Sequence, residues 1–261
     1  MFGLSLHPYG LLIGIALVVG WECAQRACLR YGYSFKQMQV MYVQMIMTGF
    51  IFARLWHGIT DWSLYVQNPI ALLYVWNGGL SIIGGILGGG LAVITILFTQ
   101  KKRNNSAQKQ ITLLVVTDLL VHALPISQAI GRLGNFVNQE LYGLPTNLPW
   151  GIYIDPEHRL LPVINHSFFH PLFLYEIVLN VIIAVMLWRK RWVVGAGGAT
   201  GLYLMLYGIG RFLLDFLRIE SGDLTLLGIS LNQYVLLALV LYGLLLIWRS
   251  HYHVTSVRTG K

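Results

Sequence analysis

The chain has 261 residues, of which 56% are hydrophobic and only 11% are charged, and its formal net charge is +8. Soluble domains carry about 25% charged residues, so this composition excludes an ordinary water-soluble domain. The apolar residues come in blocks of roughly 20 residues, the length that a helix needs to cross about 30 Å of hydrocarbon.

These blocks predict an all-α polytopic membrane protein with about seven transmembrane helices, built as one domain over 1–261. The stretch 136–170 is too polar for lipid and predicts a small head on the outer side of the membrane, with short strands around 151–155 and a turn at Pro156. Met1–Leu6 carries no positive charge, so no cleavable signal peptide is expected and the first span remains in the mature protein. In chain order, the predicted spans are 9–27, 39–57, 79–99, 111–130, 171–188, 197–217 and 231–248.

The positive charge favours a membrane orientation over nucleic acid binding. Because cytoplasmic loops carry an excess of Lys and Arg, the side where basic residues gather is predicted to be cytoplasmic. The N-terminus is then on the outer side of the membrane and the C-terminus is in the cytoplasm. Basic residues gather after the first, third, fifth and seventh spans: Arg26, Arg30, Lys36, Lys101, Lys102, Arg103, Lys109, Arg189, Lys190, Arg191, Arg249, Arg258 and Lys261. The opposite side holds Arg132, Arg159 and Arg218.

Several single residues of the spans have structural interpretations. An ionisable group at mid-bilayer costs about 2.5–3.5 kcal/mol on insertion scales, so it needs a partner or a function. Glu22 and Asp118 each stand alone in their segment and are predicted to hold helices together. Cys23 and Cys28 lie five residues apart, which matches neither a zinc site nor a pair facing each other. We interpret both cysteines as small apolar fillers.

The sixth span carries a polar stripe. Tyr207, Arg211, Asp215 and Arg218 fall at i, i+4, i+8 and i+11, so they share one helix face. We expect Arg211 to pair with Asp215 at i,i+4, which leaves one cation for an anion from elsewhere. Glu176 on the fifth span and a lipid phosphate are the two alternatives for that anion.

Glycines form a second pattern, in NGGLSIIGGILGGG over residues 77–90. Small residues four apart let membrane helices pack closely, and this interpretation covers most of these glycines. Gly78 and Gly79 precede the helix, and the alternative for them is that they let the backbone approach a ligand.

The most concentrated polarity is GRLGNFVNQE, residues 131–140, where the fourth span leaves the membrane. Gly131 and Gly134 are expected to loosen the helix. Arg132 offers a fork of donors that suits a phosphate. Together with Asn135, Asn138 and Glu140 on the same stretch, and Arg211 and Arg218 at the same level, this composition predicts an anion site fed by lipid.

In these motifs the chain resembles the prolipoprotein diacylglyceryl transferases of the bacterial inner membrane. GRLGNFVNQE matches the family motif G-R-x-G-N-F-x-N-x-E in full. The other family landmarks follow in order along nearly the whole chain: HPYG (7–10), ARLWH (53–57), WNGGLSIIGG (76–85), HPLFLYE (170–176) and YGIGRFLLDFLR (207–218).

The resemblance implies an activity and a site near the outer leaflet. The family moves the diacylglyceryl group of phosphatidylglycerol onto the lipobox cysteine thiol of a prolipoprotein, releases glycerol-1-phosphate and requires no metal or organic cofactor. By resemblance, the catalytic residues are Arg132, Arg211, Tyr207, Glu140 and Asn135. The substrate-binding set comprises Arg132 again with His7, Tyr9, Gly78, Gly79, Gly131, Asn138, Glu176, Asp215 and Arg218.

The chain departs from the family pattern at several positions. Ile83 stands where the family has a histidine that has been put forward as the base. Asn77 replaces an acidic residue, Leu172 and Phe173 replace a small hydroxyl residue and Gln, and Asp215 replaces Glu. His7, His57 and His170 are alternative bases, and a thiol beside two arginines is a third route to a thiolate. The alternative function is a phospholipid-binding paralogue with altered or lost transferase activity.

Overall fold

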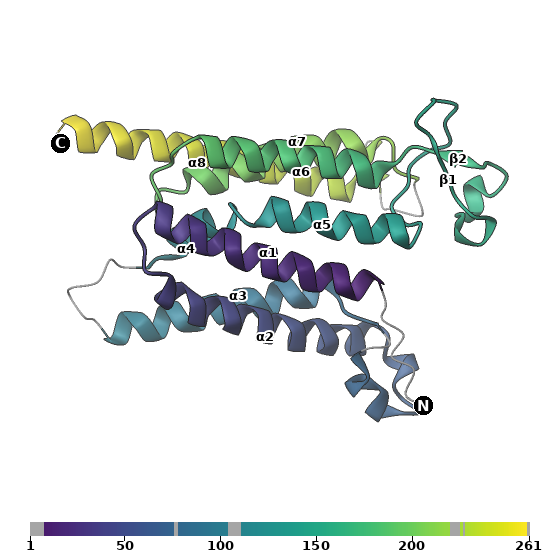
Figure 1. Cartoon of the computed structure of the whole chain (residues 1–261), viewed down its shortest axis with the longest axis horizontal. Helices are drawn as coiled ribbons and strands as arrows, with labels where there is room; N and C mark the ends of the chain where they lie inside the picture. Colours follow the sequence, from purple (N-terminus) through teal and green to yellow (C-terminus); the bar gives the residue numbers. More distant parts are fainter. Residues whose placement is uncertain (1–7, 76–77, 104–110, 220–224, 227, 260–261) are drawn as a thin grey trace. The chain divides into compact units, whose positions relative to one another are not determined.

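The computed structural model describes residues 8–75, 78–103, 111–219, 225–226 and 228–259. His7 and Asn77 lie outside these residues, and the side chain of Tyr9 is not described either. The chain divides into two compact units, one formed by Met1–Ala27 with Leu114–Lys261 and the other by Cys28–Leu113. Figure 1 labels the elements of both units.

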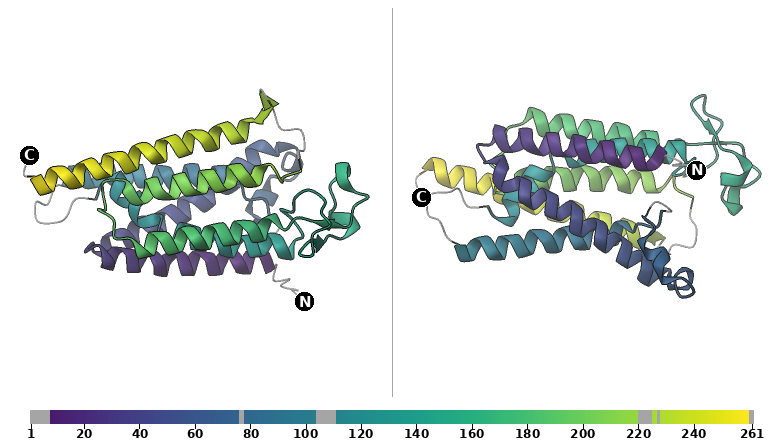
Figure 2. Two further views of the ribbon diagram at one scale, coloured as in Figure 1. Left: turned by 90° about the horizontal axis from the view of Figure 1, so that it is seen from above. Right: turned by 60° about the horizontal axis from the view of Figure 1, so that its bottom comes forward.

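The first unit contains most of the helices: α1 (Pro8–Arg30, up to Ala27), α4 (Leu113–Leu120), α5 (Leu124–Val137), α6 (Leu172–Arg189), α7 (Gly198–Asp215) and α8 (Leu231–Thr259). Within it, α5 packs on α6, α6 on α7, and α7 on α8 (Figures 1 and 2). The core between α6 and α7 is built around Ile183, Leu187, Ala199 and Tyr203. A two-residue hairpin of β3 (Thr225–Leu226) and β4 (Ile229–Ser230) leads into α8.

The predicted fourth span, 111–130, is not one straight helix. It is divided into α4 and α5, which meet at an angle of 49°. Pro125 sits in the first turn of α5 and has no N–H to continue the hydrogen bonds of α4. At this bend the His122 carbonyl accepts a hydrogen bond from Trp188 Nε1 of α6 at 3.0 Å. The bend is therefore built into the sequence and stabilised by packing.

The polar segment between α5 and α6 forms a small folded lobe. Strand β1 (Ile152–Tyr153) pairs antiparallel with β2 (Phe168–Phe169), and the short helices η4 (Pro156–His158) and η5 (Leu161–Val163) lie between them. This confirms the strands predicted around 151–155 and the turn at Pro156. The lobe has its own core of Tyr142, Ile154 and Phe169, which Ile219 joins from the segment after α7.

The second unit is a helical hairpin. It consists of α2 (Phe35–Thr60), η1 (Trp62–Leu64), η2 (Pro69–Leu73) and α3 (Ile82–Arg103), and α2 packs along α3. A Cβ added at Gly88 would lie 2.5 Å from the Thr48 carbonyl, and one at Gly84 would lie 2.6 Å from Trp56 Cβ. The prediction that glycines allow close helix packing is confirmed at these two positions, whereas Gly90 faces open space.

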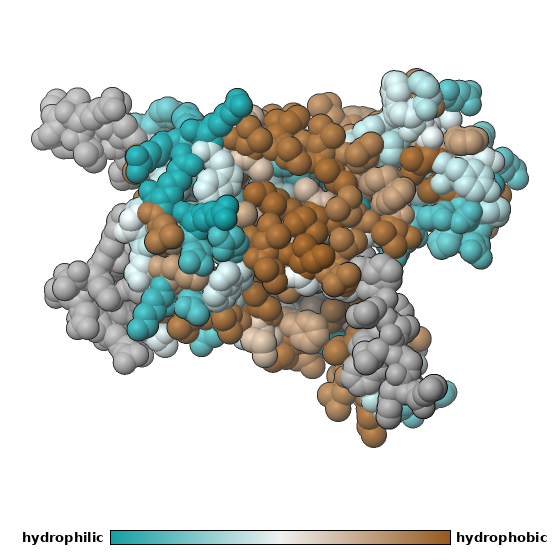
Figure 3. Space-filling view, viewed as in Figure 1, coloured by the Kyte–Doolittle hydropathy of each residue, from teal (hydrophilic) through white to brown (hydrophobic). Residues whose placement is uncertain are grey.

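The chain has the surface of an integral membrane protein. Five described helices are long and apolar enough to cross a membrane, and the bent pair α4–α5 gives a sixth. α6 buries Glu176 and Asn180 while Val178 and Ile182 are exposed, the reverse of a water-soluble helix. Figure 3 shows apolar surface along the middle of the helices of the first unit and a more polar surface over the lobe with β1 and β2. The predicted sixth span, 197–217, lies on α7, which carries Arg211, Asp215 and several glycines and is not among the five long apolar helices, so the count of seven stays a prediction.

The predictions for Glu22 and Asp118, the two acidic residues that stand alone in their spans, have different outcomes. Asp118 is fully buried and accepts hydrogen bonds from the N–H groups of Gly195, Gly197 and Thr200, so its predicted role in holding segments together is confirmed. Glu22 bonds Arg26 on its own helix at 2.8 Å, on the exposed surface, so the prediction of a contact between helices is wrong there. Cys23 and Cys28 are free thiols.

Candidate active site

A buried carboxylate holds two arginines together in the first unit. Arg132 Nε on α5 donates to Glu176 Oε2 on α6 at 2.6 Å, and Arg211 Nη1 on α7 donates to Glu176 Oε1. The Glu176 side chain is fully buried, whereas the side chains of Arg132 and Arg211 are 27% and 13% exposed. We call Arg132, Arg211 and Glu176 the braced arginine pair. Glu176 and a lipid phosphate were the two anions considered as partners for the arginines of the sixth span, and the structure places Glu176 beside Arg211.

The predicted pair between Arg211 and Asp215 is wrong. The Asp215 carboxylate accepts from Ser230 Oγ at 3.0 Å and from Asn232 Nδ2 at 3.2 Å, and it lies 4.0 Å from Arg218 Nη1. The i,i+4 spacing permits the predicted pair, but packing of α6 on α7 offers Arg211 a fully buried partner instead. Asp215 anchors the start of α8 rather than the braced arginine pair.

The hydrogen bonds continue from Arg132 to the end of α5. Arg132 Nη1 donates to Asn135 Oδ1 at 3.2 Å, and Asn135 Nδ2 donates to Glu140 Oε2 at 3.4 Å. Asn138 Nδ2 reaches the other oxygen, Glu140 Oε1, also at 3.4 Å. Glu140 therefore orients two amides, and through Asn135 it acts on Arg132. The sequence motif is thus a connected network in space.

The glycines of the motif do not loosen the helix as expected. α5 runs unbroken from Leu124 to Val137 and includes both Gly131 and Gly134. Gly134 is buried, whereas a Cβ added at Gly131 would meet nothing within 4 Å. Gly131 consequently leaves open space one residue before Arg132.

A turn that the sequence did not predict fixes Glu140. Gln139 and Leu141 both have positive φ, 54° and 53°, which side chains other than glycine rarely adopt. The Gln139 amide forms two hydrogen bonds with Asp155: its Nε2 donates to Oδ2 at 2.5 Å, and its Oε1 accepts from the backbone N–H at 2.7 Å. We call these two bonds the Gln139–Asp155 clamp. The clamp offsets the energetic cost of the left-handed backbone and connects the turn to Asp155 of the lobe. Neither Gln139 nor Asp155 predicts this contact from the sequence.

Two further predicted residues lie near this network. Tyr207 is one helical turn before Arg211 on α7, and its ring stacks on Tyr203 at 5.5 Å between centroids. Tyr203 in turn donates its hydroxyl to Gln128 on α5 at 3.0 Å, which fixes the stack between the helices. Arg218 is 41% exposed and lines a cavity of about 530 Å³ together with residues 137–142.

Gly78 and Gly79 belong to the second unit, where they serve a different purpose. Their carbonyls accept hydrogen bonds from Arg54 Nη1, and the same guanidinium bonds the carbonyls of Ala71, Leu72 and Tyr74. Arg54 is 7% exposed, and the carbonyl oxygens of the segment that connects α2 to α3 take the place of water around this buried cation. The two glycines approach an arginine of their own unit.

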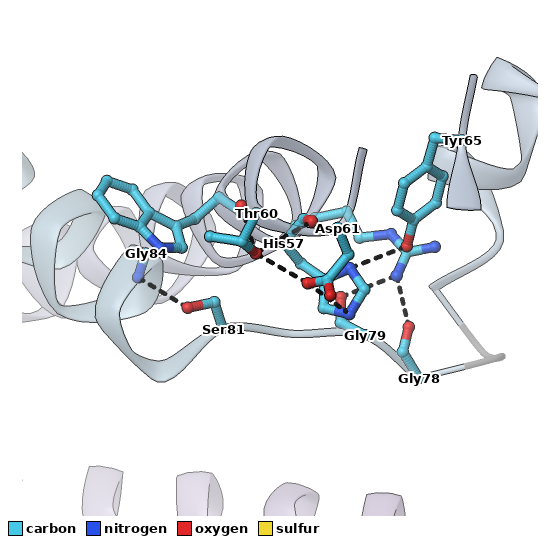
Figure 4. Close-up of polar contacts among 10 residues, drawn as sticks. His57, Thr60, Asp61, Tyr65, Gly78, Gly79, Ser81 and Gly84 are labelled. Atoms are coloured by element: carbon cyan, nitrogen blue, oxygen red, sulfur yellow. Dashed lines mark hydrogen bonds and ion pairs between the residues drawn. The ribbon is translucent and has the colours of Figure 1, made fainter. Parts of the chain in front are cut away.

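His57 lies beside Gly79 (Figure 4). Its Nδ1 is 3.0 Å from the Tyr65 hydroxyl, and its Nε2 is 3.7 Å from Asp61 Oδ2. A Cβ added at Gly79 would approach the His57 ring to 2.9 Å, which explains the absence of a side chain there. Of the other bases considered, His170 Nδ1 lies 3.1 Å from the Tyr175 hydroxyl in the first unit. Ile83, at the position of the family histidine, is 58% exposed.

The braced arginine pair and the hydrogen bonds that connect it to Asn135 and Glu140 are suited to holding an anion. Each guanidinium has about five N–H donors, and the bonds to Glu176 and Asn135 use a minority of them. Because Glu176 fixes both forks, the other donors are held in place before a ligand arrives, which is how a preorganised site stabilises developing negative charge. The arrangement fits a phosphate at the partly exposed face of Arg132 and Arg211.

Known proteins match this chain along most of its length. The family model described as prolipoprotein diacylglyceryl transferase matches residues 1–249. The phosphatidylglycerol–prolipoprotein diacylglyceryl transferase of Synechococcus elongatus is 35% identical over 253 residues, which are 94% of this chain and 84% of the relative. The proteins of the same name from Cutibacterium acnes and Halalkalibacterium halodurans are 38% and 34% identical over 84% and 94% of this chain, and over 73% and 82% of their own lengths. The chain therefore belongs to the prolipoprotein diacylglyceryl transferase family.

Proposed function

We propose that this protein transfers the diacylglyceryl group of phosphatidylglycerol to the lipobox cysteine thiol of prolipoproteins and releases glycerol-1-phosphate. Membership of the family supports the reaction. The observation that carries the assignment of the site is the braced arginine pair, in which one buried carboxylate fixes two guanidinium groups from different helices.

The chemistry assigns separate tasks to the two substrates. The acceptor thiol loses its proton and its sulfur forms a bond to the terminal glycerol carbon of the diacylglyceryl group, while the bond from that carbon to the phosphate oxygen breaks. Negative charge grows on the departing phosphate, and Arg132 and Arg211 stabilise it there. Glu176 holds both arginines in position, and Asn135 with Glu140 orients Arg132. Tyr207, beside Arg211 on α7, completes the wall toward the lipid.

The remaining predicted substrate-binding residues divide by location. Asn138 and Arg218 lie near Glu140 and are proposed to contact the substrates, and Gly131 leaves room beside Arg132. Asp215 is proposed to act indirectly by holding the start of α8. Gly78 and Gly79 shape the second unit around Arg54, and His7 and Tyr9 keep their proposed contribution from the N-terminal segment.

The protein is proposed to act in the bacterial inner membrane as a single multi-pass domain over 1–261. The distribution of basic residues supports a periplasmic N-terminus and a cytoplasmic C-terminus. In that orientation the segment 136–170 is a periplasmic head, and the braced arginine pair faces the outer leaflet, where phosphatidylglycerol and the prolipoprotein both arrive.

The test is a transfer assay with purified protein, labelled phosphatidylglycerol and a lipobox peptide. The wild type is expected to label the peptide, and Arg132→Ala or Arg211→Ala is expected to lower the rate at least about a hundredfold, the size of effect seen when one charge-stabilising donor is removed. Arg26→Ala is the matched control, because Arg26 pairs with Glu22 on the exposed surface of α1. Full activity of both site variants would refute the site assignment.

A complementation test separates the transferase from a phospholipid-binding paralogue. Ile83→His restores the family residue at an exposed position. We expect the wild type to rescue growth of a strain depleted of its own transferase, and Ile83→His to rescue growth to the same extent. Rescue by Ile83→His alone would show that this chain binds lipid but has lost a catalytic group.

A further inference from the structure

A cavity of about 530 Å³ opens at the end of α5, next to the braced arginine pair but lined by other residues. Its walls are the turn 137–142, His158 and Leu160 of the lobe, and Arg218 with Ile219 after α7. All of these segments belong to the first unit. Pockets of about 300–1,000 Å³ are the usual size for specific ligands. The cavity therefore has room for several residues of a polypeptide.

The lining is mixed in a way that suits a peptide better than a lipid. Val137, Leu141 and Leu160 supply apolar surface, whereas Glu140 and Arg218 supply charges of both signs. The Glu140 carboxylate disfavours an anionic phosphate, and the charges interrupt the continuous apolar wall that acyl chains need. Donors, acceptors and apolar side chains within one cavity match the backbone amides and side chains of an extended polypeptide.

The walls of the cavity are held rigidly. The Gln139–Asp155 clamp fixes one side of the turn. On the other side, the Tyr142 hydroxyl donates to the His158 carbonyl and accepts from the Leu160 N–H, both at 2.7 Å. Gly143 and Leu144 then pair with the segment at 217–218 through backbone contacts. A rigid wall lowers the cost of ordering a flexible chain against it.

Glu140 connects the cavity to the braced arginine pair. Its carboxylate is in the cavity lining, and the same carboxylate accepts from Asn135, which accepts from Arg132. A ligand in the cavity thus lies two hydrogen bonds away from the proposed phosphate site. A ligand bound there would therefore lie close to the phosphate of a lipid held by Arg132.

We propose that this cavity binds the acceptor polypeptide, specifically the residues directly after the acceptor cysteine. These residues leave the membrane at the level of the lobe, while the cysteine itself points toward Arg132 and Arg211. The proposal rests on the proposed transferase function and adds to it a separate subsite for the protein substrate.

Two neighbouring leucines provide a matched test. Leu160 lines the cavity and is 42% exposed, whereas Leu161 is 84% exposed and lies outside the lining. Leu160→Trp is expected to raise the KM for a lipobox peptide about tenfold by filling the cavity, with the KM for phosphatidylglycerol changed less than about twofold. Leu161→Trp, which adds the same bulk to open solvent, is expected to leave both constants at their wild-type values.

A second measurement uses the wild-type protein and so does not depend on the variants folding. A lipobox peptide carrying a photoreactive residue two positions after the cysteine is expected to cross-link within 137–142 or 158–160, as mapped by mass spectrometry. Cross-links confined to other segments, or a rise in the KM for phosphatidylglycerol instead of the peptide, would overturn the proposal. Absence of any transfer by the wild-type protein would instead overturn the proposed transferase function on which this subsite rests.

Discussion

Replacing Glu176 by Gln tests whether one carboxylate organises both arginines. The change keeps the size of the side chain and removes its charge, although the group is fully buried between Arg132 and Arg211. Removing one partner of a buried ion pair costs about 3–5 kcal/mol, and we expect the lower end because the amide oxygen still accepts one hydrogen bond. Since the arginines lose their common brace, kcat is expected to fall about a hundredfold. The KM for phosphatidylglycerol is not expected to rise, because the charges of Arg132 and Arg211, no longer neutralised by Glu176, still attract the lipid phosphate.

Asp118→Asn is the matched control for this change. Asp118 is as deeply buried as Glu176, but its partners are Gly195, Gly197 and Thr200, at 2.7–3.0 Å. A comparable loss of stability is expected, with kcat per folded molecule unchanged. The assay combines thermal unfolding in detergent with transfer kinetics normalised to the folded fraction. If Glu176→Gln keeps its kcat, or if both variants lose kcat equally, the brace does not act on catalysis.

Two further predictions concern strained backbone. Gln139→Ala keeps the left-handed φ and loses both bonds to Asp155, so we expect it to lower the free energy of unfolding by about 2 kcal/mol. Gln139→Gly loses the same bonds but relieves the backbone strain, so we expect its free energy of unfolding to fall by about half as much. Unfolding in denaturing detergent measures this order, and equal losses would show that the clamp does not offset strain. Gly78 and Gly79 both have positive φ, but only at Gly79 does a Cβ meet Arg54 Nη1, at 2.6 Å. Gly79→Ala is therefore expected to make the α2–α3 connection cleavable by protease at lower enzyme concentration than Gly78→Ala, and the reverse order would contradict the packing around Arg54.

The sequence predicted the helices and the polar positions because both depend on local pattern. Apolar blocks of membrane-spanning length mark α1, α2, α3, α6 and α8 with little ambiguity. Asn135, Asn138 and Glu140 are also close in sequence, so their contact follows from a single turn of chain. Fold class and membrane location were accessible for the same reason.

The partner of Arg211 was not accessible, because two acids were within reach and the choice depends on tertiary packing. Spacing along α7 favoured Asp215, yet the contact of α6 with α7 supplies Glu176 in a fully buried position. The bend between α4 and α5 was missed although Pro125 marks it, since the whole stretch is apolar enough for one span.

The turn at 139–141 was the least predictable part of the site. Left-handed backbone is usually signalled by glycine, and here Gln139 and Leu141 adopt it. The compensating bonds come from Asp155, which is 16 residues away in the sequence. Only the folded lobe brings the two residues together.

The proposed transfer reaction is tested most directly by following both of its products. Purified wild-type protein is incubated with phosphatidylglycerol and a lipobox peptide, and thioether-linked diacylglyceryl peptide and glycerol-1-phosphate are quantified by mass spectrometry. We expect equal amounts of the two products from the wild type and from Arg26→Ala, and almost none from Arg132→Ala or Arg211→Ala. Transfer without release of glycerol-1-phosphate, or equal yields from all four proteins, would contradict this expectation.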